Sequence, residues 1–398
     1  MRHDRRQDED LPDFLHNSPF FLPPEDFASS YPKDIPQPRP TFRQLLRSKQ
    51  ARYAIFVAGF LITVLFLRHQ TRGKHVLSRL TGSIPSCYFN PPVIPDEYEI
   101  YVTQDVDWAQ YAYALYATNT EYLCSAVMLA ESLYRSGSQA ERLLMYPNTY
   151  SLQDTSGSVE TRLLLKAQDE YHVKLVPVKI QHENTAYYYG PNWADSYTKL
   201  LAFNQTQYSR LIVLDSDSTI LAPMDELFFL PQAVAVMPKA YWLPDPRLSS
   251  HIMVLTPSPE SFKLVEKAIK KARYGVYDME IMNSLFGSLE PCITLPHRIY
   301  ALLTGEYRSG NHDPFLENVK GGGSEDWNPD LVINDAKFIH FSDHPLGKPW
   351  EVNEADTWKV APKCRQITGW EEECRTRDIW LDLYTDFWVR RKRVCGSV

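Results

Sequence analysis

The chain has 398 residues, of which 44% are hydrophobic and 23% charged, and its formal net charge is −7. This balance is typical of a folded globular protein and excludes a wholly disordered or fibrous chain. The negative net charge provides no general basic surface, so we do not expect nucleic-acid binding.

The first 52 residues are predicted to form a disordered tail. Eight of the chain's 29 prolines fall within residues 1–46, among Asp, Glu, Arg and Ser. Each proline removes a backbone hydrogen-bond donor, and few aliphatic side chains remain to build a core.

Residues 53–68 are predicted to be a single-pass transmembrane anchor. The run YAIFVAGFLITVLFL at 53–67 carries no charge, but it is shorter than the roughly 17 to 20 apolar residues of a full span. A buried core helix is the alternative. The anchor is favoured because polar segments on either side offer no packing partner, and because flanking basic side chains can extend the span. The short run favours a thin membrane of the early secretory pathway. The flanking basic residues are Arg47, Lys49, Arg52, Arg68, Arg72 and Lys74.

All six cysteines follow the predicted anchor, which fits an oxidising lumen for the C-terminal part and hence a type II orientation. Cys364 and Cys374 are candidates for a disulfide across a short loop, and the cysteine spacing does not match a zinc site. Residues 69–106 are rich in turn signals and are predicted to be a stem, with the globular domain at 107–398. The remaining cysteines are Cys87, Cys124, Cys292 and Cys395.

The globular part alternates strand-like and helix-like patterns. This order predicts an α/β fold with a Rossmann-like, doubly wound and mostly parallel sheet. Ligands bind outside the carboxyl ends of the strands in such sheets. The expected elements are a strand at 113–118, a helix at 124–137, a strand at 141–147, a helix at 160–171, a strand at 173–180, a helix at 197–207 and a strand from 210.

Two aspartates directly follow the apolar residues of this last strand. Asp215 and Asp217 are two positions apart, so at a strand end their carboxylates can face the same side and share one divalent cation. A solvated acidic turn is one alternative. Another is the nucleophile loop of haloacid-dehalogenase-type phosphatases, which the pattern Asp-x-Asp-x-Thr resembles. That family carries the motif near the start of its domain and needs a downstream acidic pair, whereas no Asp-Asp occurs in this chain.

Four blocks resemble the retaining glycosyltransferases of the glycogenin-like family (family eight). The resemblance implies a GT-A-type fold and a UDP-sugar donor. It also implies Mn2+ held by Asp215, Asp217 and His340, a ligand set that suits this cation. The blocks are YALYATNTEYLCSAVMLAESL (113–133), YTKLLAFNQTQYSRLIVLDSDSTILAPMDELF (197–228), YDMEIMNSLF (277–286) and FIHFSDHPLGKPW (338–350).

The same resemblance implies roles for further residues. Lys348 would stabilise the diphosphate leaving group, Lys199 would contact the donor sugar or phosphate, and Asp278 would orient the donor sugar. Lys199 and Asp278 are therefore the catalytic candidates. The implied donor-binding residues are Tyr116, Thr118, Asn119, Tyr122, Lys199 and Lys348.

Departures from the family pattern lie in the expected sugar pocket. Met279 replaces the family's glutamine after Asp278, and Ser249 and His251 stand where the family has the asparagine and glycine of Asn-Ser-Gly. A remodelled pocket is expected, and self-glucosylation as in glycogenin is not implied. The block YDMEIMN looks most like fungal Golgi relatives that transfer N-acetylglucosamine to mannose chains of glycoproteins.

The expected protein is thus a type II Golgi membrane enzyme. It would transfer N-acetylglucosamine from UDP-N-acetylglucosamine to a mannose-containing glycan, with retention of anomeric configuration. Two alternatives stay open. One is a membrane-anchored, non-catalytic glycan-binding or scaffold protein with a degenerate transferase fold, which the loss of the glutamine favours. The other is a different donor sugar, such as glucose or galactose.

Overall fold

The computed structural model describes residues that all lie within one compact unit, Leu77–Val398. The predicted tail, the predicted anchor and nearly all of the predicted stem fall outside these residues, as do Cys87 and Cys292. No helix in the part that the structure describes has the length and apolar character needed to span a membrane. The described residues are 106–154, 157–182, 195–273, 275–287, 294–317, 325–368 and 371–396.

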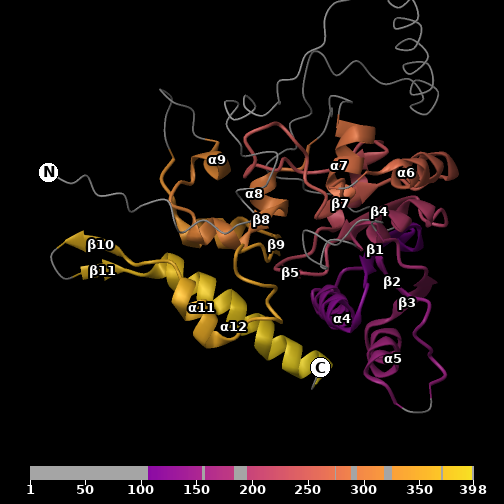
Figure 1. Ribbon diagram of the computed structural model, residues 1–398, viewed down its shortest axis with the longest axis horizontal. Coiled ribbons are helices and arrows are strands. Elements are labelled where there is room, and N and C mark those ends of the chain that lie inside the picture. Colours follow the sequence, from indigo (N-terminus) through magenta and orange to yellow (C-terminus); the bar gives the residue numbers. More distant parts are fainter. Residues whose placement is uncertain are drawn as a thin grey trace, which may run out of the picture. The chain divides into compact units, whose positions relative to one another are not determined.

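A six-stranded sheet lies at the centre of the molecule, in the order β3-β2-β1-β4-β7-β6 (Figure 1). The first four strands in this order are parallel, which confirms the predicted α/β sheet, whereas β7 runs antiparallel to both of its neighbours, β4 and β6, and makes the sheet mixed. The strands are β1 (Tyr111–Tyr116), β2 (Glu141–Pro147), β3 (Val173–Val178), β4 (Arg210–Leu214), β6 (Ala235–Val236) and β7 (Ile252–Leu255).

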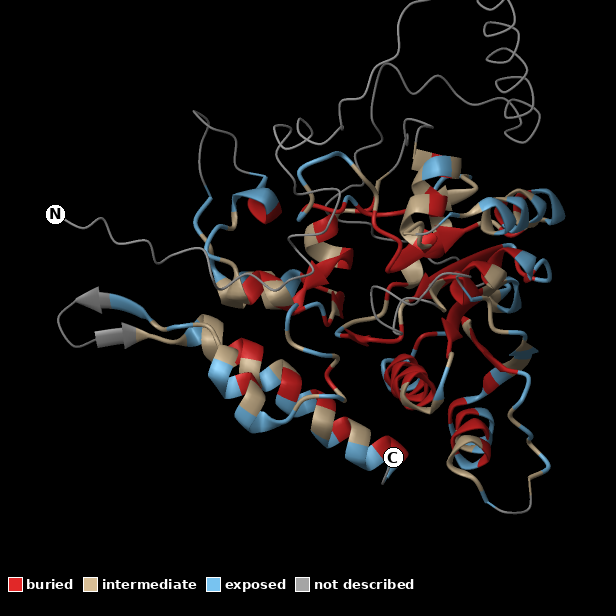
Figure 2. Ribbon diagram, in the orientation of Figure 1, coloured by how far each residue is buried: buried red, intermediate tan, exposed pale blue. Residues whose placement is uncertain are grey.

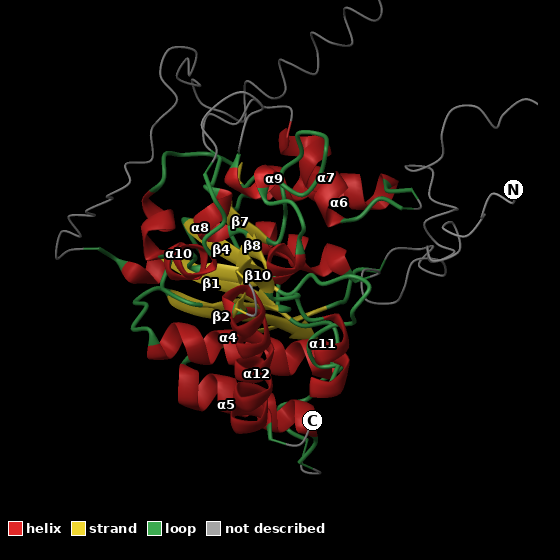
Figure 3. Ribbon diagram, turned by 90° about the vertical axis from the view of Figure 1, so that its left-hand side faces the viewer, coloured by secondary structure: helices red, strands yellow, loops and turns green. Residues whose placement is uncertain are grey.

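Helices cover both faces of this sheet (Figure 3). Successive side chains of β1 point to opposite faces of the sheet, and both faces are apolar. Tyr113 and Leu115 belong to one hydrophobic cluster, and Ala112 and Ala114 belong to the other, so helices must bury both faces. In Figure 2 the buried residues follow the strands and the inward sides of the helices. On one face lie α4 (Thr120–Arg135), α5 (Val159–Tyr171) and α12 (Arg375–Cys395), and on the other η2 (Ser196–Asn204), α6 (Pro259–Lys271) and α7 (Asp278–Met282).

The helix predicted at 197–207 is a 3₁₀ helix, η2, rather than an α-helix. Four consecutive residues, Tyr197 to Leu200, are buried here. Tertiary packing of these side chains overrides the helical propensity of the segment, and because 3₁₀ runs are short the helix ends at Asn204.

A second, three-stranded sheet brings the C-terminal part of the chain to the end of β4. Its order is β5-β9-β8, formed by β5 (Ser218–Ile220), β9 (Phe338–His340) and β8 (Leu302–Leu303). Ser218 lies opposite His340 in the antiparallel β5–β9 pair. This register places His340 beside the residue that precedes Ser218, which is Asp217.

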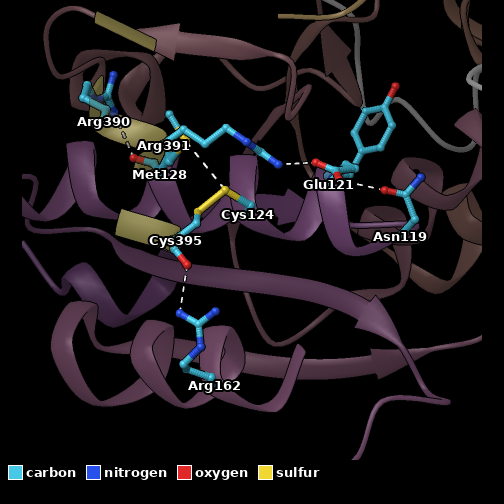
Figure 4. The surroundings of a disulfide bond; sticks show 9 residues. Asn119, Glu121, Cys124, Met128, Arg162, Arg390, Arg391 and Cys395 are labelled. Atoms are coloured by element: carbon cyan, nitrogen blue, oxygen red, sulfur yellow. Dashed lines mark hydrogen bonds and ion pairs between the residues drawn. A yellow bond between two sulfur atoms is a disulfide. The ribbon is translucent and has the colours of Figure 1, made fainter. Parts of the chain in front are cut away.

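Two disulfides fasten the C-terminal region. Cys364–Cys374 closes the β10–β11 hairpin, which confirms the predicted pairing, and Cys124–Cys395 joins α4 to the end of α12 (Figure 4). The remaining elements are η1 (Trp108–Gln110), η3 (Asp225–Phe229), the π-helix η4 (Asn283–Gly287), α8 (His297–Tyr300), η5 (Thr304–Arg308), α9 (Asp313–Leu316), α10 (Pro329–Asp335), α11 (Glu354–Val360), β10 (Arg365–Thr368) and β11 (Glu371–Glu373).

Candidate active site

A cavity of about 350 Å³ lies at the carboxyl ends of β1 and β4. The strand order reverses at this point, because the chain adds β2 and β3 on one side of β1 and β4 on the other. Such a switch point leaves a crevice for ligands above the sheet. Nine of the ten predicted site residues line the cavity, namely Tyr116, Thr118, Tyr122, Lys199, Asp215, Asp217, Asp278, His340 and Lys348.

The three predicted metal ligands converge within this cavity. One ligand atom from each of Asp215, Asp217 and His340 lies within 4.8 Å of the other two. The Nε2 atom of His340 is 3.2 Å from Asp217 Oδ1 and 3.9 Å from Asp215 Oδ2. Two carboxylates and one imidazole form a donor set that suits Mn2+, so the residues present fit the predicted cation.

Residues 215–217, which follow β4 and carry the two predicted aspartate ligands, are called the metal loop below. Lys199 connects this loop to α7. Its buried Nζ atom is 2.7 Å from Asp215 Oδ1 and 2.7 Å from Asp278 Oδ2. Burial acts to lower the pKa of Lys199, but Asp215 and Asp278 outweigh it and hold the pKa above its usual value. The ammonium therefore remains charged and fixes both carboxylates. Ser250 Oγ also donates to Asp278 Oδ2 at 2.5 Å.

Lys348 approaches the metal loop from the opposite end of the domain's sequence and forms an ion pair with Asp217 Oδ2. Burial alone would raise the pKa of Asp217, but Lys348 and His340 outweigh it, and the pKa lies well below its usual value. Burial raises the pKa of the neighbouring Asp215, against the opposing effect of Lys199. Lys348 thus holds Asp217 as a carboxylate, the form in which it can bind a cation.

Tyrosines and a threonine line the side of the cavity formed by β1 and the start of α4. The hydroxyl of Tyr116 donates to Asp215 Oδ1 at 2.9 Å, and Tyr122 packs edge-on against Trp350 at 4.8 Å between ring centroids. Burial first, and then the nearby aspartates, raise the pKa of Tyr116, so its hydroxyl stays a donor. Asn119 is the predicted residue that does not line the cavity. Its side chain accepts from the Tyr122 N–H and caps α4.

The other side of the cavity is lined by the residues that depart from the glycogenin-like pattern. Met279 lines it with an apolar thioether where the family has an amide. The imidazole of His251 is buried, its Nδ1 lies 2.7 Å from Ser249 Oγ, and its ring stacks on His340 at 5.1 Å with an interplanar angle of 14°. Six further lining residues were not predicted as site residues, namely Asp195, Ser196, Trp242, Ser250, Tyr277 and Glu280. Trp242 lies in a loop, where no periodic pattern could indicate it.

Comparison with known proteins places this site in context. No protein-family model matches the chain. The chain is 45% identical over 302 residues to "Glucose N-acetyltransferase 1" of Gibberella zeae, a match that covers 74% of this chain and 64% of that protein. It is 39% identical over 372 residues to "Glucose N-acetyltransferase 1" of Aspergillus fumigatus, with 89% of both chains covered. It is also 30% identical over 166 residues to a "Putative UDP-glucuronate:xylan alpha-glucuronosyltransferase 4" of Arabidopsis thaliana, covering 42% of this chain and 27% of that protein.

Solved structures give weaker likenesses. The galactosyltransferase LgtC, in complex with donor and acceptor sugar analogs, is 11% identical, covers 69% of this chain and 95% of its own, and has a TM-score of 0.42. The glycosyltransferase GlyE of Streptococcus pneumoniae is 14% identical, covers 72% of this chain and 63% of its own, and has a TM-score of 0.39. At these TM-scores the structural likenesses add nothing to the sequence matches.

Proposed function

Because the chain belongs to the glucose N-acetyltransferase 1 family, we propose that it transfers N-acetylglucosamine from UDP-N-acetylglucosamine to a mannose hydroxyl of a glycoprotein glycan. The transfer retains the anomeric configuration. The name of these relatives, glucose N-acetyltransferase 1, supports this donor sugar. The resemblance of the block around Asp278 to fungal N-acetylglucosaminyltransferases supports the mannose acceptor.

The observation that carries the proposal is that three possible metal ligands and two lysines line one cavity. They are Asp215, Asp217, His340, Lys199 and Lys348. A diphosphate linked to a sugar needs a cation site and additional positive charge, because charge builds on the leaving UDP as its bond to the sugar breaks. Mn2+ bound by the two aspartates and His340 would supply Lewis-acid stabilisation of that charge. The ammonium of Lys348, which contacts Asp217, adds a second positive charge at the same place.

The environment of Asp278 favours attack from the face that the diphosphate leaves. Its Oδ2 atom already accepts from Lys199 and Ser250, so this oxygen is engaged in holding the carboxylate in position. Met279 offers no polar atom capable of acting as a nucleophile at the family's glutamine position. In the proposed step the bond from C1 of the sugar to UDP breaks and a bond from C1 to the mannose oxygen forms. The mannose proton passes to a phosphate oxygen of the departing UDP.

We also propose that the protein is a single-pass type II membrane protein of the Golgi, with residues 1–52 cytoplasmic, 53–68 in the membrane and 107–398 lumenal. Cys124–Cys395 and Cys364–Cys374 support an oxidising compartment for the folded part. Protease treatment of intact Golgi vesicles tests this arrangement. We expect the globular domain to survive and an N-terminal tag to be removed, and digestion of the domain in sealed vesicles would contradict it.

UDP release and product analysis test the proposed activity. The full-length chain in detergent is supplied with Mn2+, mannose oligosaccharides and, in separate reactions, UDP-N-acetylglucosamine, UDP-glucose and UDP-galactose. We expect transfer mainly from UDP-N-acetylglucosamine, with the first product in the α configuration by proton NMR. Equal use of UDP-glucose, a β product or no transfer from any donor would each contradict the proposal.

A further inference from the structure

The cavity contains an exposed indole whose place suggests a role toward the acceptor. We propose that Trp242 is the stacking platform for the hexopyranose ring of the acceptor, a specificity-determining residue of the proposed transfer. The inference rests on the proposed function, because it takes the acceptor to be a neutral sugar.

Trp242 differs from other exposed apolar side chains in where it lies. Its residue exposure is 38%, and among the large hydrophobic residues that are exposed in the described part of the chain it is the one that lines this cavity. The others lie away from the cavity, including Trp358 at 52%. An aromatic ring with an open surface, set in a cavity with a few polar groups, is the usual means of holding a ligand with an apolar face.

The loop that carries Trp242 is held in place by backbone and side-chain contacts. Within it, Ala240 N donates to Arg247 O at 2.8 Å and Leu243 N donates to Ala240 O at 3.0 Å. Asn283 holds the end of the loop, since its Oδ1 accepts from Leu248 N at 2.9 Å and its Nδ2 donates to Leu248 O at 2.7 Å. The indole is therefore presented in a fixed position, which lowers the entropic cost of binding a ring against it.

A stack of three rings connects Trp242 with the cation site. Its indole lies 5.7 Å from the ring of His251 with an interplanar angle of 19°, and His251 in turn stacks on His340. Tyr241 meets the indole edge-on at 5.2 Å. His251 therefore occupies one side of the indole, and the exposed area belongs to the part of the ring that these neighbours do not cover.

The order of the strands places Trp242 on the side away from the expected uridine. Tyr116 ends β1 and Tyr122 lies in the first turn of α4, which follows it. The loop with Asp215 and Asp217 follows β4, and the loop that carries Trp242 precedes β7, on the other side of β4. A UDP-sugar whose diphosphate lies at the metal loop extends in both directions, with the uridine toward β1 as the family resemblance implies. The donor sugar and the acceptor then lie toward β7 and α7.

The neighbouring polar groups suit a neutral sugar. Glu280 also lines the cavity, and its carboxylate is held by Tyr277 N at 3.0 Å and Arg247 at 3.4 Å. A carboxylate accepts hydrogen bonds from hydroxyl groups but repels an anionic ligand. An indole for the C–H face and a carboxylate for the hydroxyls together fit a hexopyranose.

Acceptor kinetics of Trp242→Ala and Trp242→Phe test this role in the full-length enzyme, with methyl α-mannoside as the probe. We expect Trp242→Ala to raise the acceptor KM at least about tenfold and Trp242→Phe to change it by less than about threefold. The KM for UDP-N-acetylglucosamine, and its hydrolysis without acceptor, stay unchanged in both. Trp358→Ala is the matched control for an exposed tryptophan outside the cavity and leaves every parameter unchanged.

Two results would overturn the role of Trp242. One is an acceptor KM of Trp242→Ala within about twofold of the wild type. The other is a proportional loss of hydrolysis and transfer, which indicates that the indole only supports packing. A wild-type enzyme that hydrolyses UDP-N-acetylglucosamine but transfers to no mannoside refutes the proposed acceptor instead. In that case saturation-transfer NMR with methyl hexopyranosides tests whether Trp242 binds a sugar ring. Equal binding by wild type and Trp242→Ala would contradict the stacking role of Trp242.

Discussion

At Lys348 a single ammonium has two potential partners, the carboxylate of Asp217 and the diphosphate of a donor. The lysine is mostly buried and lines the cavity next to the metal loop. Charge-assisted contacts to phosphate oxygens are among the stronger polar interactions in proteins. The contact with Asp217 therefore holds the ammonium at the place where the diphosphate is expected.

We predict that Lys348→Met weakens UDP binding at least about tenfold, since the substitution removes the charge and keeps the length of the side chain. Isothermal titration calorimetry with UDP and Mn2+ measures this loss. Lys359→Met removes a lysine of α11 that lies outside the cavity and pairs only with Asp356 among the described residues, and we expect it to leave UDP affinity unchanged. Equal affinities for wild type and Lys348→Met would exclude the diphosphate contact.

His297 gives the fold a pH dependence that is separate from catalysis. Burial lowers the pKa of His297, and its Nε2 lies 2.6 Å from Phe315 O, so the folded state holds a neutral imidazole. Because the pKa is lower in the folded than in the unfolded chain, the unfolded chain binds the proton first as the pH falls. Stability is therefore lost as the pH drops below the unfolded value of about 6.5.

We predict that His297→Gln makes the free energy of unfolding less sensitive to acid, although its stability at neutral pH is lower because the packing against Tyr241 changes. Urea denaturation at about pH 7 and about pH 5 measures the difference in slope. The same loss of stability between these two pH values in wild type and variant would show that His297 is not responsible.

Among the elements, α12 ties the C-terminal end of the chain to α4. The disulfide Cys124–Cys395 is accompanied by a hydrogen bond from Arg162 to Cys395 O at 2.8 Å and by an ion pair of Arg391 with Glu121 (Figure 4). The buried Arg390 adds a hydrogen bond to Met128 O at 3.1 Å. Since α4 begins at the edge of the cavity, these contacts also support the site.

The two disulfides differ in how much of the chain they restrain. Cys124 and Cys395 are 271 positions apart, whereas Cys364 and Cys374 are 10 apart. In the chain-entropy model, replacing the first pair by serine costs about 3 kcal/mol more of unfolding free energy than replacing the second. Chemical denaturation of the two double-serine variants measures this. A larger loss for the Cys364/Cys374 variant would contradict the prediction.

The sequence predicted the elements whose signal is local. Residues 211–214 form a fully apolar run before two aspartates, and the helix at 159–171 ends where the strand β3 begins, so both were recognised. The antiparallel β7 was not, because Ile252–Leu255 is short and its partner β4 lies far away in the sequence. The 3₁₀ form of η2 depends on burial in the tertiary structure, which no helical pattern records.

The candidate site shows the same difference between residues with a local sequence motif and residues placed by the tertiary structure. The aspartates of the metal loop and the residues of the final block were predicted because each follows a short motif. Ser250, which binds Asp278, stands at the serine of the family's Asn-Ser-Gly, but both of its neighbours depart from that motif and it was not predicted as a site residue. Trp242 lies in a loop whose position depends on Asn283 and Arg247. Residues of this kind become visible only when the three-dimensional neighbours are known.

At the scale of the whole described domain, its C-terminal segments pack against elements from its N-terminal half. The β5–β9 pairing brings His340 to the metal loop, the loop after β9 brings Lys348 there, and α12 packs on α4 (Figure 1). The site therefore combines residues from 116 to 348, and it depends on the fold of the whole globular part. Loss of the C-terminal region would remove both the predicted metal ligand His340 and the ammonium of Lys348.

The most direct test of the central claim is the Mn2+ dependence of transfer in wild type and Asp217→Asn. Chelation by EDTA should abolish transfer from UDP-N-acetylglucosamine by the wild type, and Mn2+ should restore it. Asp217→Asn should keep the wild-type circular dichroism but bind Mn2+, by electron paramagnetic resonance titration with UDP, at least about 100-fold more weakly, with a matching loss of transfer. Transfer that survives EDTA, or a folded Asp217→Asn with wild-type activity, would contradict the account.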